Sequence, residues 1–146
     1  MCSILLVEDH PDTRHAFAVL LESWGHQITT RDSVAGGLAF VNANDVDVIL
    51  SDIGLPDQNG YEFIAQVRRS NSRVIAIAIS AYFTASDRRP RDEAGFDMYF
   101  SKPVDLAELR FTLARISAQF GWKAAGERER QDRIVPATEV ELRHAI

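Results

Sequence analysis

Val46-Asp47-Val48-Ile49-Leu50-Ser51-Asp52 is a short apolar run that ends in a carboxylate. Its β-branched content predicts a strand. Its nearly continuous apolar character is typical of a parallel sheet buried on both faces, so we expect a central position in such a sheet. Ligands bind outside the carboxyl ends of the strands in open parallel sheets, which makes Asp52 the first candidate functional residue.

Three further apolar runs also end in polar side chains. Residues 3–7 precede Glu8 and Asp9, residues 74–79 precede Ser80, and residues 98–100 precede Ser101, Lys102 and Pro103. The carboxyl ends of parallel strands meet at one edge of the sheet, so three carboxylates, a hydroxyl and an ammonium are expected to converge there. These groups suit a divalent cation and a phosphoryl group.

Segments with helical spacing separate the strand-like runs. We expect helices near 11–24, 33–41, 61–68 and 105–116, and one more strand at 28–30. Gly36-Gly37 weakens the second helix by about 1 kcal/mol per glycine. A helix at 84–94 should be short or irregular, because an interior proline such as Pro90 costs about 3 kcal/mol. The resulting (βα)5 order predicts an α/β fold: a doubly wound parallel five-stranded sheet in a flavodoxin-like three-layer sandwich.

Length and composition fit one ordinary domain. The chain has 146 residues, of which 46% are apolar and 25% charged. Cys2 is the single cysteine, so no intrachain disulfide is expected, and no membrane span or signal peptide is recognisable. We therefore expect a cytoplasmic location. The net charge of −5 lies within residues 1–120, and an acidic domain without a basic stripe is a poor partner for nucleic acid.

The βα pattern stops near residue 120. Residues 121–146 carry five basic and five acidic side chains and too few apolar ones for a core of their own. Thr138 and Glu141 have capping-box spacing for a short helix. We predict one domain over 1–120 and a partly helical extension over 121–146. The extension is expected to dock either on that domain or on a second copy of the chain. In the second case the chain would form a homodimer.

The acids at the strand ends suit phosphoryl chemistry. A carboxylate is a reasonable nucleophile toward phosphorus when the charge of the donor is neutralised. Glu8, Asp9 and Asp52 offer the oxygen ligands that Mg²⁺ or Mn²⁺ prefers. Lys102 can pair with one phosphoryl oxygen, and the Ser80 hydroxyl can donate to another.

Together these residues resemble the receiver domains of bacterial response regulators. The matching motifs are Ile-Leu-Leu-Val-Glu8-Asp9, Asp52-Ile-Gly-Leu-Pro-Asp-Gln-Asn-Gly60, Ser80-Ala81 and Gly95-Phe-Asp-Met-Tyr99-Phe-Ser-Lys102-Pro103. Each motif alone is weak, but their order and their positions at strand ends make the set specific. The likeness covers residues 1–120, which identifies them as the receiver domain.

The resemblance implies a phosphoacceptor in two-component His-Asp phosphorelay signalling. Asp52 would accept a phosphoryl group from a histidine kinase or a histidine phosphotransfer protein. The metal would be bound by Glu8, Asp9, Asp52 and the backbone carbonyl of Gly54, and Lys102 would contact the phosphoryl group. Self-catalysed phosphoryl acceptance and slow autodephosphorylation would be the only reactions, so the chain is not expected to be an enzyme.

The resemblance also implies a switch made of Ser80 and Tyr99. In the family the hydroxyl moves to the phosphoryl group and the aromatic ring turns inward. This alters the face formed by the fourth helix, the fifth strand and the fifth helix, which binds a downstream protein. In many relatives the side chain at the position of Gly54 flanks the phosphoryl group, and a glycine has no such side chain. Tyr82 occupies the facing position after Ser80. These two positions therefore do not predict the lifetime of the phosphoryl group.

Alternative functions differ from this one in identifiable positions. A receiver-like module that acts without phosphorylation would not need the intact acids, hydroxyl and lysine. A dehalogenase-type phosphatase wants a second aspartate where Gly54 stands, and a flavodoxin-like redox carrier needs a phosphate-cradling loop where the chain has Glu8 and Asp9. The sequence of residues 55–62 also resembles that of receivers attached to hybrid histidine kinases, so the chain is either a stand-alone protein or an excised domain.

Overall fold

A computed structural model describes residues 1–70, 73–81 and 95–119. Within these ranges one parallel sheet has the strand order β2-β1-β3-β4-β5. The strands are β1 (Ser3–Val7), β2 (Gln27–Arg31), β3 (Val48–Asp52), β4 (Ile75–Ser80) and β5 (Met98–Ser101), and the helices are α1 (Pro11–Ser23), α2 (Val34–Ala43), α3 (Gly60–Ser70) and α5 (Leu106–Gln119).

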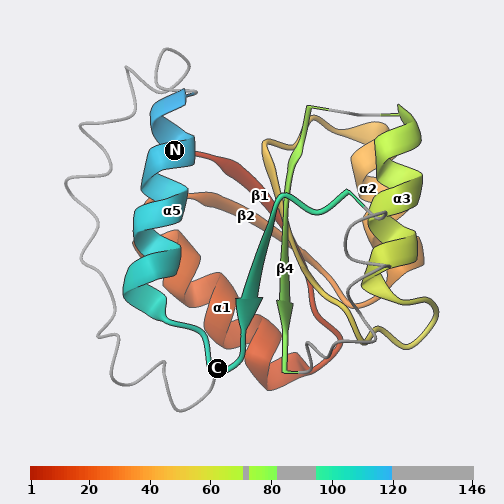
Figure 1. Cartoon of the computed structure of the whole chain (residues 1–146), viewed down its shortest axis with the longest axis horizontal. Coiled ribbons are helices and arrows are strands. Elements are labelled where there is room, and N and C mark those ends of the chain that lie inside the picture. The colour runs from red at the N-terminus through yellow and green to blue at the C-terminus, as the bar shows by residue number, and fades with distance from the viewer. Residues whose placement is uncertain (71–72, 82–94, 120–146) are drawn as a thin grey trace.

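Helices cover both faces of the sheet and form three layers with it (Figure 1). α1 and α5 lie on one face, while α2 and α3 lie on the other. The core is accordingly divided into two clusters of buried side chains, one including Phe17 and Leu109 and the other including Phe63 and Ile64. This arrangement confirms the predicted doubly wound, flavodoxin-like fold.

The apolar run at 46–52 forms the middle strand, as its sequence predicts. β3 pairs with β1 on one side and β4 on the other, and Ile49 and Leu50 are completely buried. The registers place Val7 beside Ser51, and Asp52 beside Ile79. The carboxyl ends of β1, β3 and β4 are therefore level, which brings the residues that follow them to one edge.

Polar side chains cap the N-termini of helices on both faces of the sheet. Ser33 Oγ accepts a hydrogen bond of 3.1 Å from the Gly36 amide, and Asp105 Oδ1 accepts one of 3.1 Å from the Glu108 amide. His10 Nδ1 accepts one of 3.4 Å from the Thr13 amide at the start of α1. These caps satisfy amides that have no partner within the helix.

Gly37 has a packing role that its helix propensity does not reveal. A Cβ atom at this position would lie 3.0 Å from Cζ of Phe63 and 3.2 Å from Cγ2 of Val7. The glycine thus lets α2 approach both α3 and β1 closely. Gly37 lowers the helix propensity of α2, but it also allows α2 to pack closely against α3 and β1.

Two predicted segments lie outside the described residues. They are the irregular helix at 84–94, with Tyr82 before it, and the extension at 121–146. In the part of the chain that the structure describes, the helices are too short or too polar to cross a membrane.

Candidate functional site

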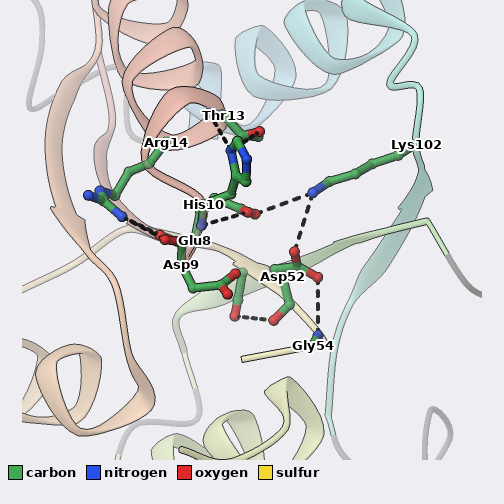
Figure 2. Close-up of polar contacts among 9 residues, drawn as sticks. Glu8, Asp9, His10, Thr13, Arg14, Asp52, Gly54 and Lys102 are labelled. Atoms are coloured by element: carbon green, nitrogen blue, oxygen red, sulfur yellow. Dashed lines mark hydrogen bonds and ion pairs between the residues drawn. The ribbon is translucent and has the colours of Figure 1, made fainter. Parts of the chain in front are cut away.

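Three carboxylates meet at the carboxyl edge of the sheet (Figure 2). Glu8 and Asp9 directly follow β1, and Asp52 is the last residue of β3. One carboxylate oxygen from each of the three lies within 4.8 Å of the others. Glu8 is buried, the Asp52 side chain is 15% exposed, and Asp9 faces solvent. The predicted convergence of these acids is therefore confirmed.

Lys102 extends from the end of β5 toward the same acids (Figure 2). Its Nζ atom lies 3.3 Å from Oε2 of Glu8 and 3.3 Å from Oδ2 of Asp52. The Lys102 amide donates a hydrogen bond of 2.9 Å to the carbonyl oxygen of Ser80, which fixes the end of β5 against the end of β4. The ammonium thus lies between two carboxylates that come from different strands.

Burial makes the ionised form of Glu8 unfavourable. Desolvation, followed by the negative charge of Asp52, raises the pKa of Glu8 to about 7, although the Lys102 ammonium acts in the opposite direction. A cation between the carboxylates would reverse this repulsion. Oxygen ligands from three carboxylates, one of them buried, fit a hard divalent cation such as Mg²⁺ or Mn²⁺.

Arg14 holds the backbone of the acidic pair. Its Nη1 atom donates to the carbonyl oxygens of Glu8, at 2.9 Å, and Asp9, at 3.2 Å. The His10 amide donates to Oε1 of Glu8 at 3.3 Å, while the His10 ring caps α1. The His10 ring therefore has a helix-start role in this structure. Arg14 was not predicted from the sequence, and its location one turn into the helix after the acids is the signal that could have indicated it.

The loop after β3 is closely packed against Asp52. The Gly54 amide donates a hydrogen bond of 3.1 Å to Oδ1 of Asp52, and the Gly60 amide donates one of 2.7 Å to the carbonyl oxygen of Ile53. A Cβ atom at Gly60 would lie 2.5 Å from the carbonyl oxygen of Asp52, so α3 can begin this close only with a glycine. A Cβ atom at Gly54 would meet nothing within 4 Å.

Ser80 and Tyr99 occupy different parts of the predicted site region. Ser80 is buried at the end of β4, beside Ser101 in the register with β5. Tyr99 is partly buried, and its ring centroid lies 5.8 Å from that of Phe96, which lies 6.1 Å from that of Tyr61. Ser80 at the end of β4 and Tyr99 within β5 lie where the strand pattern predicts them. A switch role for these two residues stays a prediction.

Residues 4–114 match the response regulator receiver domain family. The chain therefore belongs to this family, which functions in two-component signal transduction. The resemblance drawn from the strand-end motifs is confirmed.

Relatives in curated proteins include both kinases and regulators. The sensor histidine kinase RcsC of Salmonella typhi is 33% identical over 111 residues, which cover 76% of this chain and 12% of RcsC. The KDP operon transcriptional regulatory protein KdpE of Escherichia coli is 35% identical over 113 residues, which cover 77% of this chain and 50% of KdpE. The chain thus spans only a part of these relatives.

Solved structures share the fold. The receiver domain of the TMAO respiratory system response regulator TorR is 29% identical, with a TM-score of 0.72 and coverage of 82% of this chain and 98% of that one. The response regulator TrrA from Thermotoga maritima, a complex with Mg(2+)-BeF, is 24% identical, with a TM-score of 0.71 and coverage of 80% and 99%.

Proposed function

We propose that this receiver domain is a phosphoacceptor and that Asp52 takes its phosphoryl group from a phosphohistidine of a histidine kinase or a histidine phosphotransfer protein. The observation that carries this proposal is the placement of Asp52 within 4.8 Å of the Glu8 and Asp9 carboxylates and 3.3 Å from the Lys102 ammonium. A nucleophile, ligands for a charge-neutralising cation and a phosphoryl-binding cation are thus in one place.

In the proposed reaction, a carboxylate oxygen of Asp52 forms a bond to phosphorus. The phosphorus–nitrogen bond to the donor histidine breaks, and its electron pair stays on the ring nitrogen. Lys102 pairs with Asp52 before transfer and with a phosphoryl oxygen afterwards. The acids and the Gly54 carbonyl oxygen would hold Mg²⁺ or Mn²⁺, which neutralises phosphoryl charge when bound.

Signal output in this proposal depends on Ser80 and Tyr99. The Ser80 hydroxyl donates to the phosphoryl group, and the Tyr99 ring turns inward in response. This changes the face to which β5 and α5 contribute, where a downstream protein binds. The relatives support a role between kinase and effector, since RcsC is a sensor histidine kinase and KdpE a transcriptional regulatory protein. In this proposal the domain itself catalyses two reactions, which are phosphoryl acceptance and slow autodephosphorylation.

The test treats the full chain with a small phosphodonor, with and without Mg²⁺, and follows intact mass. We expect one added phosphoryl group that requires Mg²⁺ and is absent in Asp52→Asn. Asp12→Asn, which changes an exposed aspartate in the first turn of α1, is the matched control and should still be modified. An unmodified wild-type chain would favour the phosphorylation-independent interaction module instead.

A further inference from the structure

We infer that Asp57 is a positioning residue for the metal site, because it attaches the loop that carries Gly54 to the N-terminus of α2. This inference rests on the proposed function, in which the Gly54 carbonyl oxygen is a metal ligand. Both carboxylate oxygens of Asp57 bind amides of α2, so Asp57 would act through the backbone of the loop rather than by touching the cation.

The attachment consists of two hydrogen bonds between distant segments. Oδ1 of Asp57 accepts from the Val34 amide at 2.9 Å, and Oδ2 accepts from the Ala35 amide at 2.9 Å. The first amides of a helix have no partner within it and carry partial positive charge. The same hydrogen bonds lower the pKa of Asp57, so its carboxylate is ionised at neutral pH and suited to this position.

The loop needs this attachment more than α2 does. α2 already has its own N-cap, since Ser33 Oγ accepts from the Gly36 amide at 3.1 Å. The loop, in contrast, is otherwise attached at its two ends and by one exposed contact. Gly54 pairs with Asn59 in an isolated antiparallel bridge, and Asn59 Oδ1 caps α3 by accepting from the Glu62 amide at 2.9 Å. Between them, Gln58 Oε1 accepts a hydrogen bond of 2.8 Å from Gln66 Nε2 of α3, and this side-chain contact is exposed to solvent. Asp57 lies between the two bridge residues and anchors the turn that they enclose.

An anchored loop binds a cation at lower cost. A backbone carbonyl that already has its bound position loses less conformational freedom when it becomes a ligand. Residues that orient metal ligands without touching the metal typically change its affinity by about 10- to 100-fold when mutated. Asp57 orients one ligand among several, so we expect an effect near the lower end of this range.

The experiment compares two variants that remove hydrogen bonds from the same helix end. Asp57→Ala removes the loop attachment, whereas the matched control Ser33→Ala removes the cap that α2 supplies itself. Mg²⁺ alone is titrated into each full-length chain, and the amide signals of Gly54 and Gly60 are followed by NMR. Exchange of the Gly60 amide is measured in the metal-free proteins.

We expect Asp57→Ala to raise the Kd for Mg²⁺ about tenfold and to speed exchange of the Gly60 amide. Ser33→Ala should change the Kd less than twofold. Asp57→Asn keeps an acceptor oxygen without the charge, and its Kd should lie between those of wild type and Asp57→Ala.

Two results would overturn the inference alone while the wild-type chain binds Mg²⁺. They are an unchanged Kd in Asp57→Ala and an equal loss in Ser33→Ala. A wild-type chain that binds no Mg²⁺ would instead overturn the metal site of the proposed function, and the inference with it. The two failures are therefore distinguishable.

Discussion

Nζ of Lys102 lies 3.3 Å from Oδ2 of Asp52, although the two residues are 50 positions apart and β4 separates their strands. The same atom lies 3.3 Å from Oε2 of the buried Glu8. The ammonium therefore compensates negative charge in the metal-free protein at the place where the proposed function puts a phosphoryl group. A residue with a role in the proposed phosphoryl transfer should therefore also stabilise the resting domain.

Replacing Lys102 with methionine should destabilise the metal-free protein at pH 8 by about 2 kcal/mol, between the values for exposed and fully buried ion pairs. The reason is that two neighbouring carboxylates lose their shared cation. Urea denaturation at pH 8 measures this, and saturating Mg²⁺ should recover most of the loss. Arg69→Met, at an exposed position near the end of α3, is the control and should change stability little. Equal losses in the two variants would contradict the compensating role.

Stability should fall as pH rises through the titration of Glu8. Its pKa is raised from 4.5 to about 7 in the folded protein. The native state then binds more protons than the unfolded state between these values, so the free energy of unfolding decreases across this window. At 1.36 kcal/mol per unit, the loss is at most about 3 kcal/mol. Denaturation of wild type and Glu8→Gln from pH 4 to 8 without metal measures it as the difference between the two curves.

Mg²⁺ provides the control for the Glu8 titration. The cation binds the ionised carboxylates, so it should stabilise wild type more at pH 8 than at pH 5. A wild-type curve parallel to that of Glu8→Gln would show that Glu8 does not titrate in this range.

The site residues that directly follow strands could be predicted from the sequence. Glu8, Asp9, Asp52 and Lys102 converge because parallel strands bring their carboxyl ends to one edge and because β1, β3, β4 and β5 are consecutive in the sheet. The three layers could be predicted from a second pattern, the alternation of short apolar runs with helical segments. Local pattern alone was sufficient for this part of the fold and site.

The residues that support the site could not be predicted in this way. Arg14 acts on two carbonyl oxygens of the preceding loop, and Asp57 binds amides more than 20 positions away. The Arg14 contact is local, and strand-end spacing does not indicate it. The Asp57 contact depends on which loop faces which helix, and this is set by tertiary packing rather than by spacing. A polar residue in a helix or loop has many alternative partners, so its sequence context does not distinguish them.

Acidification should destabilise the protein through His26. Its Nδ1 accepts a hydrogen bond of 3.2 Å from the Cys2 amide, and burial lowers the pKa of His26 from 6.5 to about 4. The unfolded state binds more protons between these values, so the free energy of unfolding falls as pH decreases through them, by at most about 3 kcal/mol. His26→Gln should remove this pH dependence. NMR titration of the ring is the direct check, and an ordinary pKa near 6.5 would rule it out.

The two glycines of α2 should respond oppositely to alanine. Alanine has the better helix propensity by about 1 kcal/mol at either position. At Gly37 the new Cβ would lie 3.0 Å from Cζ of the fully buried Phe63, so α2 must move away from α3, and we expect a net loss of about 1–2 kcal/mol. At Gly36 the nearest atoms, at 3.3 Å, are Cδ of the flexible Arg31 side chain and Oγ of Ser33. Gly36→Ala should therefore be neutral or stabilising.

Thermal and urea denaturation of Gly36→Ala and Gly37→Ala measures this difference directly. Because the two positions are adjacent in one helix, propensity and unfolded-state effects are nearly the same in both variants. The difference between them therefore isolates the contact of α2 with Phe63 and Val7. If Gly37→Ala were as stable as Gly36→Ala, α2 would not need this close approach, and glycine at position 37 would have no packing reason.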